Sequence, residues 1–249
     1  MEVHHHSHHP KNWKEYITEF IMLFAAVTLG FFAENVREHQ VINHKTHQNL
    51  QSIILDLKKD SILIQERLQE YTKASILLDK LNFLSINYQL STISKNEFLD
   101  SSLNINFDLT FGNSFYINNS SYKNTISSGS FSNINSTELK RTISDYYEVY
   151  GAKLNDNNKI LDDVVEFYTV HTFPKPGGRI GKNKSNEELN YLKDYYKSSN
   201  LFNSSILNKD FIIYNQKAKD RVDIYLGLIK KFNTKNSELL NLLASDQQE

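Results

Sequence analysis

The feature that most constrains this chain is an uncharged apolar stretch near its start, Phe20–Ala33 (FIMLFAAVTLGFFA). Extended back to Tyr16, the segment would measure roughly 27 Å as a helix, at about 1.5 Å per residue. That length only just crosses the ~30 Å hydrocarbon core of a bilayer. The stretch therefore predicts one transmembrane helix, followed by a polar part of the chain that remains in water.

The residues that flank the stretch support this prediction. Trp13 and Tyr16 carry amphipathic rings that favour the membrane–water interface, so we expect them to anchor one end of the helix. The run Glu34–Arg37 ends the apolar segment at the other side. We expect three parts: a histidine-rich cytoplasmic tail (1–14), a transmembrane anchor (15–36) and a soluble helical-bundle domain (37–249).

Two alternatives remain open for this segment. A secretory signal peptide would need a basic start and a small-x-small cleavage site, for which Ala25-Ala26 and Gly30 are poor candidates. A buried helix of a soluble protein is also compatible with so short an uncharged run.

One face of the expected membrane helix differs from the rest. This face contains Glu19, Met22, Ala26, Gly30 and Ala33. The pair at 26 and 30 has the small-xxx-small spacing that allows close contact between helices. A carboxyl at this depth is costly. We interpret the face as a docking surface for another subunit or a second copy; a shallow Glu19 that reaches water is the alternative.

The orientation is weakly marked. Lys11 and Lys14 precede the span, and Arg37 and Lys45 follow it, so the positive-inside rule does not decide. The histidines add partial positive charge before the span. We expect the N-terminal tail to lie in the cytoplasm and the large C-terminal domain to lie outside it.

Five histidines lie within six positions of the tail. Imidazole is the commonest metal ligand, but a flexible tail lacks the fixed geometry of a metal site. An expression tag and a contact with lipid headgroups are the other interpretations. We expect no resident metal or cofactor. The weak candidates for metal ligands are His4, His5, His6, His8 and His9.

The composition limits the class of function. The 28 basic and 29 acidic side chains nearly cancel, which gives no electrostatic argument for nucleic acid. Membrane lipids and other membrane subunits, or a second copy, are the expected partners. The absence of cysteine excludes disulfides and thiolate chemistry. Few glycines and three prolines favour long helices.

The rest of the chain predicts a mainly all-α fold. Residues 35–84 read as one helix continuous with the anchor, in which positions 50, 57, 64, 71 and 78 keep a seven-residue step. Serines at the companion positions 61 and 75 make a bundle helix a better interpretation than a coiled coil. Further helices are expected over 135–171, 187–198 and from 210, with a final turn at 238–243.

Between these helices lies an Asn- and Ser-rich insertion, residues 85–136. Here we expect a helical turn after Ser94, a brief strand at 103–109 and a short helix at 121–127 that stops at Gly129. Asn135 and Glu138 have the spacing of a capping box. The segment Phe173–Lys184 (FPKPGGRIGKNK) reads as an exposed loop, because it lacks the order of a phosphate-binding loop.

No catalytic constellation is visible. His171 is the only histidine after position 47, and neighbouring acids such as Asp162 and Asp163 point in different directions on a helix. The group His39, His44 and His47 reads as solvated helix side chains. We therefore expect a protein that is not an enzyme.

Two stretches resemble known sequences. HHPKNWKEYITEFIMLFAAVTLGFFAENVREH is similar to the anchor of an uncharacterised group of single-pass membrane proteins from Gram-negative bacteria. FGNSFYINNSSYKNTISSGSFSNINSTELKRTISDYYEVY resembles the central segment of a related domain-of-unknown-function family. The histidine tract and ENVREH depart from that second family. The resemblance implies an inner-membrane protein with a helical extracytoplasmic domain and no assigned activity.

These observations suggest two functions. The chain is expected to be an accessory or structural subunit of a membrane complex. The alternative is an extracytoplasmic sensor that binds a ligand and signals through its anchor to a partner.

Overall fold

The computed structural model describes residues 12–172, 185–198 and 200–246, and every regular element within them is helical. The predicted all-α fold is confirmed, with no strand among these residues. The elements are α1 (Trp13–Gln89), α2 (Lys95–Asp108), α3 (Ser120–Ser127), the 3-10 turn η1 (Ser130–Asn133), α4 (Thr137–Ser144), the π-helix η2 (Asp145–Gly151), α5 (Ala152–His171), α6 (Asn186–Ser198), α7 (Asn200–Leu207) and α8 (Phe211–Asp246).

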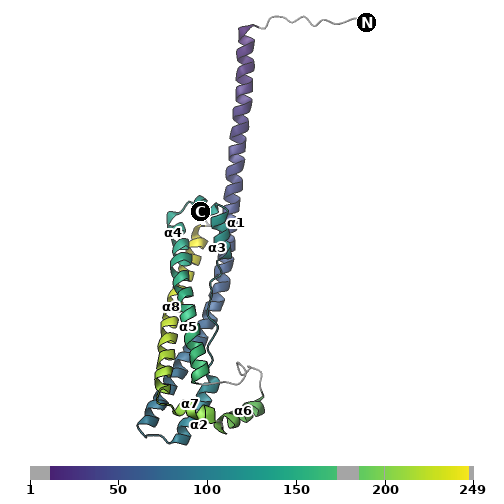
Figure 1. Cartoon of the computed structure of the whole chain (residues 1–249). Coiled ribbons are helices and arrows are strands. Elements are labelled where there is room, and N and C mark those ends of the chain that lie inside the picture. Colours follow the sequence, from purple (N-terminus) through teal and green to yellow (C-terminus); the bar gives the residue numbers. More distant parts are fainter. Residues whose placement is uncertain (1–11, 173–184, 199, 247–249) are drawn as a thin grey trace.

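Helix α1 dominates the molecule. It runs for 77 residues without a break, as expected from a segment with no proline and one early glycine. Its first half projects alone from the rest of the protein, and its second half forms one wall of a bundle (Figure 1). The helix crosses the expected boundary at residues 36 and 37 without interruption, so anchor and domain share one rod.

The bundle is built on the contact between α1 and α8, which run antiparallel, with α4, η2 and α5 forming a third rod beside them (Figure 1). The seven-residue row expected on α1 is buried along its whole length: Leu50, Leu57, Ile64, Tyr71 and Leu78. The expected stripe of α8 is buried as well: Phe211, Ala218, Val222, Tyr225, Ile229 and Phe232. The interpretation of α1 as a bundle helix is therefore confirmed.

The segment 109–119, which connects α2 to α3, has no regular structure, and side chains satisfy its backbone. Tyr225 accepts a hydrogen bond from the Phe115 amide (2.8 Å) and donates one to Asn158 (2.8 Å), which in turn donates to the Phe115 carbonyl (2.7 Å). Tyr71 donates to the Gly112 carbonyl (2.7 Å). Buried backbone groups need such partners, so these side chains hold the segment against the core.

The predicted strand at 103–109 is wrong, because residues 103–108 belong to α2 and Leu109 caps its end. Ser94 caps this helix by accepting a hydrogen bond from the Glu97 amide (3.2 Å). Phe98, Leu99 and Leu103 are buried at helical spacing. Alternation of apolar and polar residues over a few positions does not distinguish a strand from a helix. The packing of α2 against α1 favours the helix.

Of three smaller predictions about the ends of helices, one is confirmed and two are wrong. Gly129 follows α3 with a φ of 75°, which confirms the left-handed stop. The cap of α4 is Ser136, which accepts from the Leu139 amide (3.1 Å), so the expected cap at Asn135 is wrong by one residue. The expected separate turn at 238–243 is also wrong, since α8 continues to Asp246.

The helices expected at 187–198 and from 210 are confirmed as α6 and α8. The helix expected over 135–171 is present but contains the π-helix η2. The loop expected at Phe173–Lys184 lies outside the described residues.

Candidate functional site

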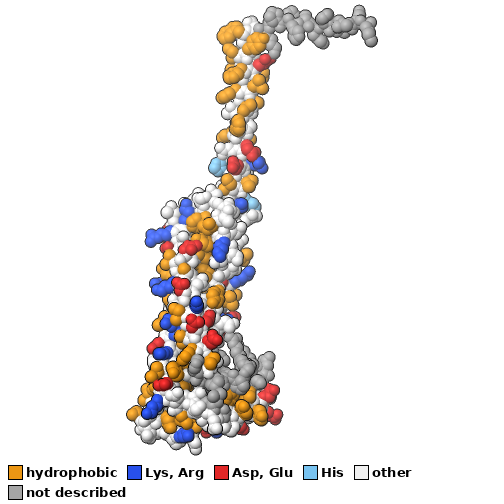
Figure 2. Space-filling model, viewed as in Figure 1, with side chains coloured by type: hydrophobic (Ala, Val, Ile, Leu, Met, Phe, Trp, Pro, Cys, Tyr) orange, Lys and Arg blue, Asp and Glu red, His pale blue; other side chains and the backbone are white. Residues whose placement is uncertain are grey.

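The apolar stretch forms the exposed first part of α1. An 18-residue window of this helix has a mean hydropathy of 1.8, and none of that window is buried against the rest of the protein. Phe20, Phe24 and Phe31 are 67%, 63% and 75% exposed, and apolar side chains cover the projecting rod (Figure 2). Among the described residues this is the one helix apolar and long enough to cross a membrane.

The expected docking face lies on this rod. Met22, Ala26, Gly30 and Ala33 are exposed and Glu19 is half-buried. A Cβ added at Gly30 would meet no atom within 4 Å, so the glycine serves no packing need within the chain. The expected interface anchors Trp13 and Tyr16 are also exposed, at 67% and 59%.

Eight of the nine histidines fall into two groups. His4, His5, His6, His8 and His9 lie outside the described residues. His39, His44 and His47 are exposed on α1, and a ring nitrogen of His44 lies 3.0 Å from the side-chain nitrogen of Gln48. Within the described ranges no three His, Cys, Asp or Glu side chains gather in a way that could hold a metal ion.

A polar recess lies where α1 leaves the bundle. It has a volume of about 370 Å³, and its walls come from α1 and from the turn between α3 and η1. Arg37 forms an ion pair with Glu34 on the α1 wall, while Ser128 and Asn133 stand on the other side. The lining residues are Glu34, Arg37, Glu38, Val41, Ile42, Lys45, Ser128, Ser130 and Asn133. The recess could hold a small polar group close to the apolar rod.

Two buried carboxyls of α1 hold the start of α3. Asp60 accepts from the Asn118 amide (3.2 Å), and Asp56 accepts from the Asn118 side chain (2.8 Å) and the Ser121 amide (3.3 Å). The unpaired amides at the start of a helix favour such negative partners. Burial, with a smaller contribution from the nearby Asp56, raises the pKa of Asp60 to about 7, although the hydrogen bond from the Asn118 amide opposes the shift.

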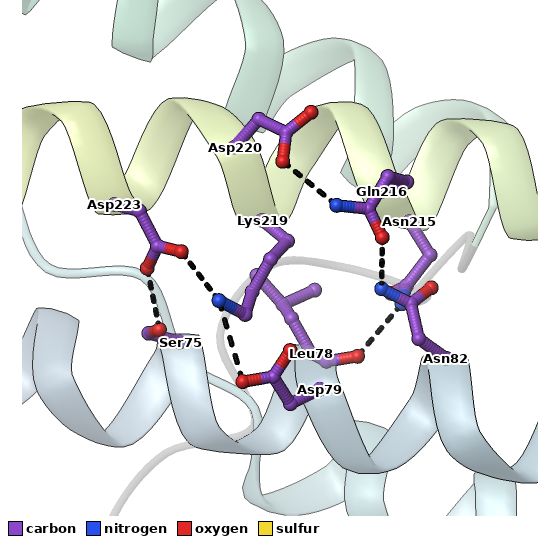
Figure 3. Close-up of polar contacts among 9 residues, drawn as sticks. All are labelled: Ser75, Leu78, Asp79, Asn82, Asn215, Gln216, Lys219, Asp220 and Asp223. Carbon is purple, nitrogen blue, oxygen red and sulfur yellow. Dashed lines mark hydrogen bonds and ion pairs between the residues drawn. The ribbon is translucent and has the colours of Figure 1, made fainter.

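A second polar cluster joins α1 to α8 near the far end of the bundle (Figure 3). Asn215 is fully buried and donates to the Leu78 carbonyl (2.8 Å) and to the side chain of Asn82 (2.7 Å). Its oxygen accepts from Tyr168 of α5 (3.0 Å). One amide side chain of α8 therefore bonds to two other helices, α1 and α5, and fixes the register of the three.

The same figure shows an ion pair network on the surface beside Asn215 (Figure 3). Lys219 of α8 lies between Asp223 of its own helix and Asp79 of α1, 3.3 Å from the latter. Ser75 donates to Asp223 (2.6 Å). Such pairs contribute little individually at a surface, but they add specificity to the α1–α8 contact.

Sequence reasoning missed these polar clusters. Asp56 and Asp60 flank the apolar position Leu57 on α1, and Asn215 and Asn236 are fully or almost fully buried on the core side of α8. A polar residue inside an apolar row was the available signal. The partners lie far along the chain, so the sequence did not reveal which groups would satisfy them.

Comparison with protein-family models, with curated proteins and with solved structures found no match to this chain.

Proposed function

We propose that this chain is a membrane-anchored accessory or structural subunit of a membrane protein complex, without catalytic activity. The observation that carries the proposal is the apolar first part of α1, which the rest of the protein leaves uncovered. Leaving so many large apolar side chains in water would be unfavourable. A bilayer covers them, and the length of the stretch suits one crossing.

In this proposal residues 15–36 cross a bacterial inner membrane, with the tail in the cytoplasm and the bundle in the periplasm. The resemblance to anchored families of Gram-negative bacteria supports the location. The face that contains Glu19, Ala26 and Gly30 then meets a helix of another subunit.

The proposal is tested by native electrophoresis of the full-length chain, extracted from membranes in mild detergent. We expect a complex larger than one copy, and we expect Gly30→Leu and Glu19→Leu to weaken it, since both change the docking face. Phe24→Leu is the matched control on another side of the helix. Migration as a lone monomer, unchanged by these substitutions, would contradict the proposal.

A second function, the reporting of a bound ligand across the membrane, is favoured by the recess beside the stalk of α1. The recess joins the α3–η1 turn to a helix that continues unbroken into the anchor. A thermal-shift screen of small polar molecules would favour this function if a hit raises the melting temperature and Lys45→Gln abolishes the effect.

A further inference from the structure

The side of α1 that faces away from the bundle carries a second row with seven-residue spacing. We call Leu55, Ile62, Gln69, Ile76 and Phe83 the outer row. Its four apolar members are 57%, 64%, 51% and 68% exposed. Ile62 lies five positions after Leu57 of the buried row, so the outer row is turned about 140° around the helix from the buried row. A helix whose outer side faces only water normally presents polar residues on that side.

The outer row continues the expected docking face of the anchor. Ten helical turns take 36 residues, so Glu19 is followed on the same side of α1 by Leu55, and Ala26 is followed by Ile62. Gly30 and Ala33 are followed in the same way by Glu66 and Gln69, which are also exposed. Because α1 is unbroken, a helix that contacts the anchor on this face meets the outer row when it leaves the membrane.

A groove of about 580 Å³ lies along this side of α1. Gln69 and Ile76 of the outer row line it, together with Lys73 and Lys80. The surface is therefore only shallowly hollowed, but it is apolar and bordered by cations.

The charge around the outer row is predominantly basic. Lys58, Lys59, Lys73 and Lys80 are all exposed, and none forms an ion pair with another described residue. Two exposed carboxylates, Glu66 and Asp79, lie among these lysines, and each pairs with another cation, Arg67 and Lys219 respectively. Glu70 pairs with Arg67 as well.

The basic charge around the outer row distinguishes between the possible binding partners of this surface. A second copy placed face to face would bring lysines against lysines, and juxtaposed like charges disfavour association. The chain's own segment 173–184 carries four cations (Lys175, Arg179, Lys182 and Lys184) and no acid, so it is repelled in the same way. A helix with an apolar stripe and acidic flanks is complementary to the surface.

We propose that the outer row binds an acidic, apolar-striped helix of a partner membrane subunit, which leaves the bilayer alongside α1. This inference rests on the proposed function and names the partner of that docking face. To run from Ala33 to Phe83 the partner helix must extend about 75 Å beyond the membrane, at ~1.5 Å per residue.

The test is site-specific photo-crosslinking of the full-length chain in the membranes of the cells that make it. A photoreactive amino acid is placed at Ile62 in the outer row, at Ala26 in the membrane face, or at Ile160 of α5 as a control of similar exposure. We expect one heterologous partner at positions 62 and 26 and none at 160. The partner peptide linked to position 62 should contain more Asp and Glu than Lys and Arg.

Charge reversal sharpens the test. Lys73→Glu combined with Lys80→Glu should lower the adduct yield at position 62 at least about tenfold, because complementary flanks become repulsive. Lys159→Glu on α5 is the matched control and should leave the yield unchanged. An unchanged yield in the double variant would overturn the charge argument.

Other outcomes separate the two proposals. An adduct of two copies of this chain, a link from position 62 to residues 173–184, or a partner peptide without acidic excess would overturn the outer-row inference alone. So would an adduct at position 26 with none at 62. No adduct at either position would contradict the proposed function itself.

Discussion

Asp60 is almost fully buried beside Asp56 where α1 meets the start of α3. Its pKa rises from an ordinary 3.8 to about 7, chiefly because burial disfavours the charged form. The folded protein therefore retains a proton that the unfolded chain loses near pH 4. The stability that this proton provides is complete below pH 4 and is lost as the pH rises towards 7.

We expect Asp60→Asn to remove this part of the pH dependence. The neutral amide still accepts from the Asn118 amide, so the variant should be more stable than the parent by about 4 kcal/mol at pH 8, and the difference should shrink towards pH 4. Urea unfolding of the full-length chain in mild detergent at several pH values measures this. Asp163→Asn, at an exposed position of α5, is the control. Equal pH slopes in the parent and Asp60→Asn would contradict the account.

Asn215 should be the costliest single amide to remove. Asn215→Ala leaves the Tyr168 hydroxyl, the Leu78 carbonyl and the Asn82 side chain without this partner in the core. Unsatisfied buried groups cost about 1–3 kcal/mol, so we expect a loss of about 3 kcal/mol in the free energy of unfolding. The exposed Lys217→Ala on the same helix should lose less than about 1 kcal/mol. Similar losses in both variants would show that the buried network does not stabilise the contact between helices.

At the scale of elements, α1 has two apolar rows with different tasks. Leu57 belongs to the buried row and is 0% exposed, whereas Leu55 of the outer row is 57% exposed. In the chain purified without a partner, Leu57→Ala should destabilise the bundle by about 2–5 kcal/mol through the cavity that it leaves. Leu55→Ala should cost less than about 0.5 kcal/mol. Thermal melts followed by circular dichroism compare them, and a cost for Leu55→Ala that matches that of Leu57→Ala would contradict this division.

The long helices could be predicted because their apolar rows repeat over many turns. Two apolar patterns each repeat over far more turns than a chance alternation would. They are the row from Leu50 to Leu78 on α1 and the stripe from Phe211 to Phe232 on α8. The short segment at 103–109 could not be assigned from its pattern, because its apolar residues fit both periods. Only contact of α2 with α1 favours the helix.

The π-helix η2 was also not predictable. Tyr146 and Tyr147 are neighbours in sequence and both are buried. In a regular helix, successive side chains point 100° apart, so it is difficult to bury both against the same neighbouring element. Tyr146 stacks on Phe232 with ring centroids 4.6 Å apart, and Tyr147 stacks on Tyr122 at 4.4 Å. The widened turn lets one helix serve two packing partners.

The candidate sites were predictable to different degrees. The exposed apolar part of α1 follows from composition and length alone. The recess at Arg37 and Lys45 and the carboxyl cluster at Asp56 and Asp60 depend on contacts with residues 118–133. Such long-range pairings are set by tertiary packing, and one sequence carries no direct record of them.

At the scale of the whole molecule, the chain is a rod with a bundle attached to one half. The uncovered half is apolar up to Ala33, and about 12 further residues of helix separate Ala33 from the first buried position at Thr46. At ~1.5 Å per residue this stalk holds the bundle roughly 18 Å from the end of the apolar stretch. The geometry suits a domain carried above a membrane surface by a stiff support.

The most direct measurement of the central claim is extraction of isolated membranes with alkaline carbonate, followed by ultracentrifugation without detergent. We predict that the full-length chain stays in the pellet, and that a chain lacking residues 1–36 appears in the supernatant with its helical circular dichroism spectrum intact. Recovery of the full-length chain in the supernatant as a dispersed protein would contradict insertion of α1 into the bilayer, and with it the proposed function.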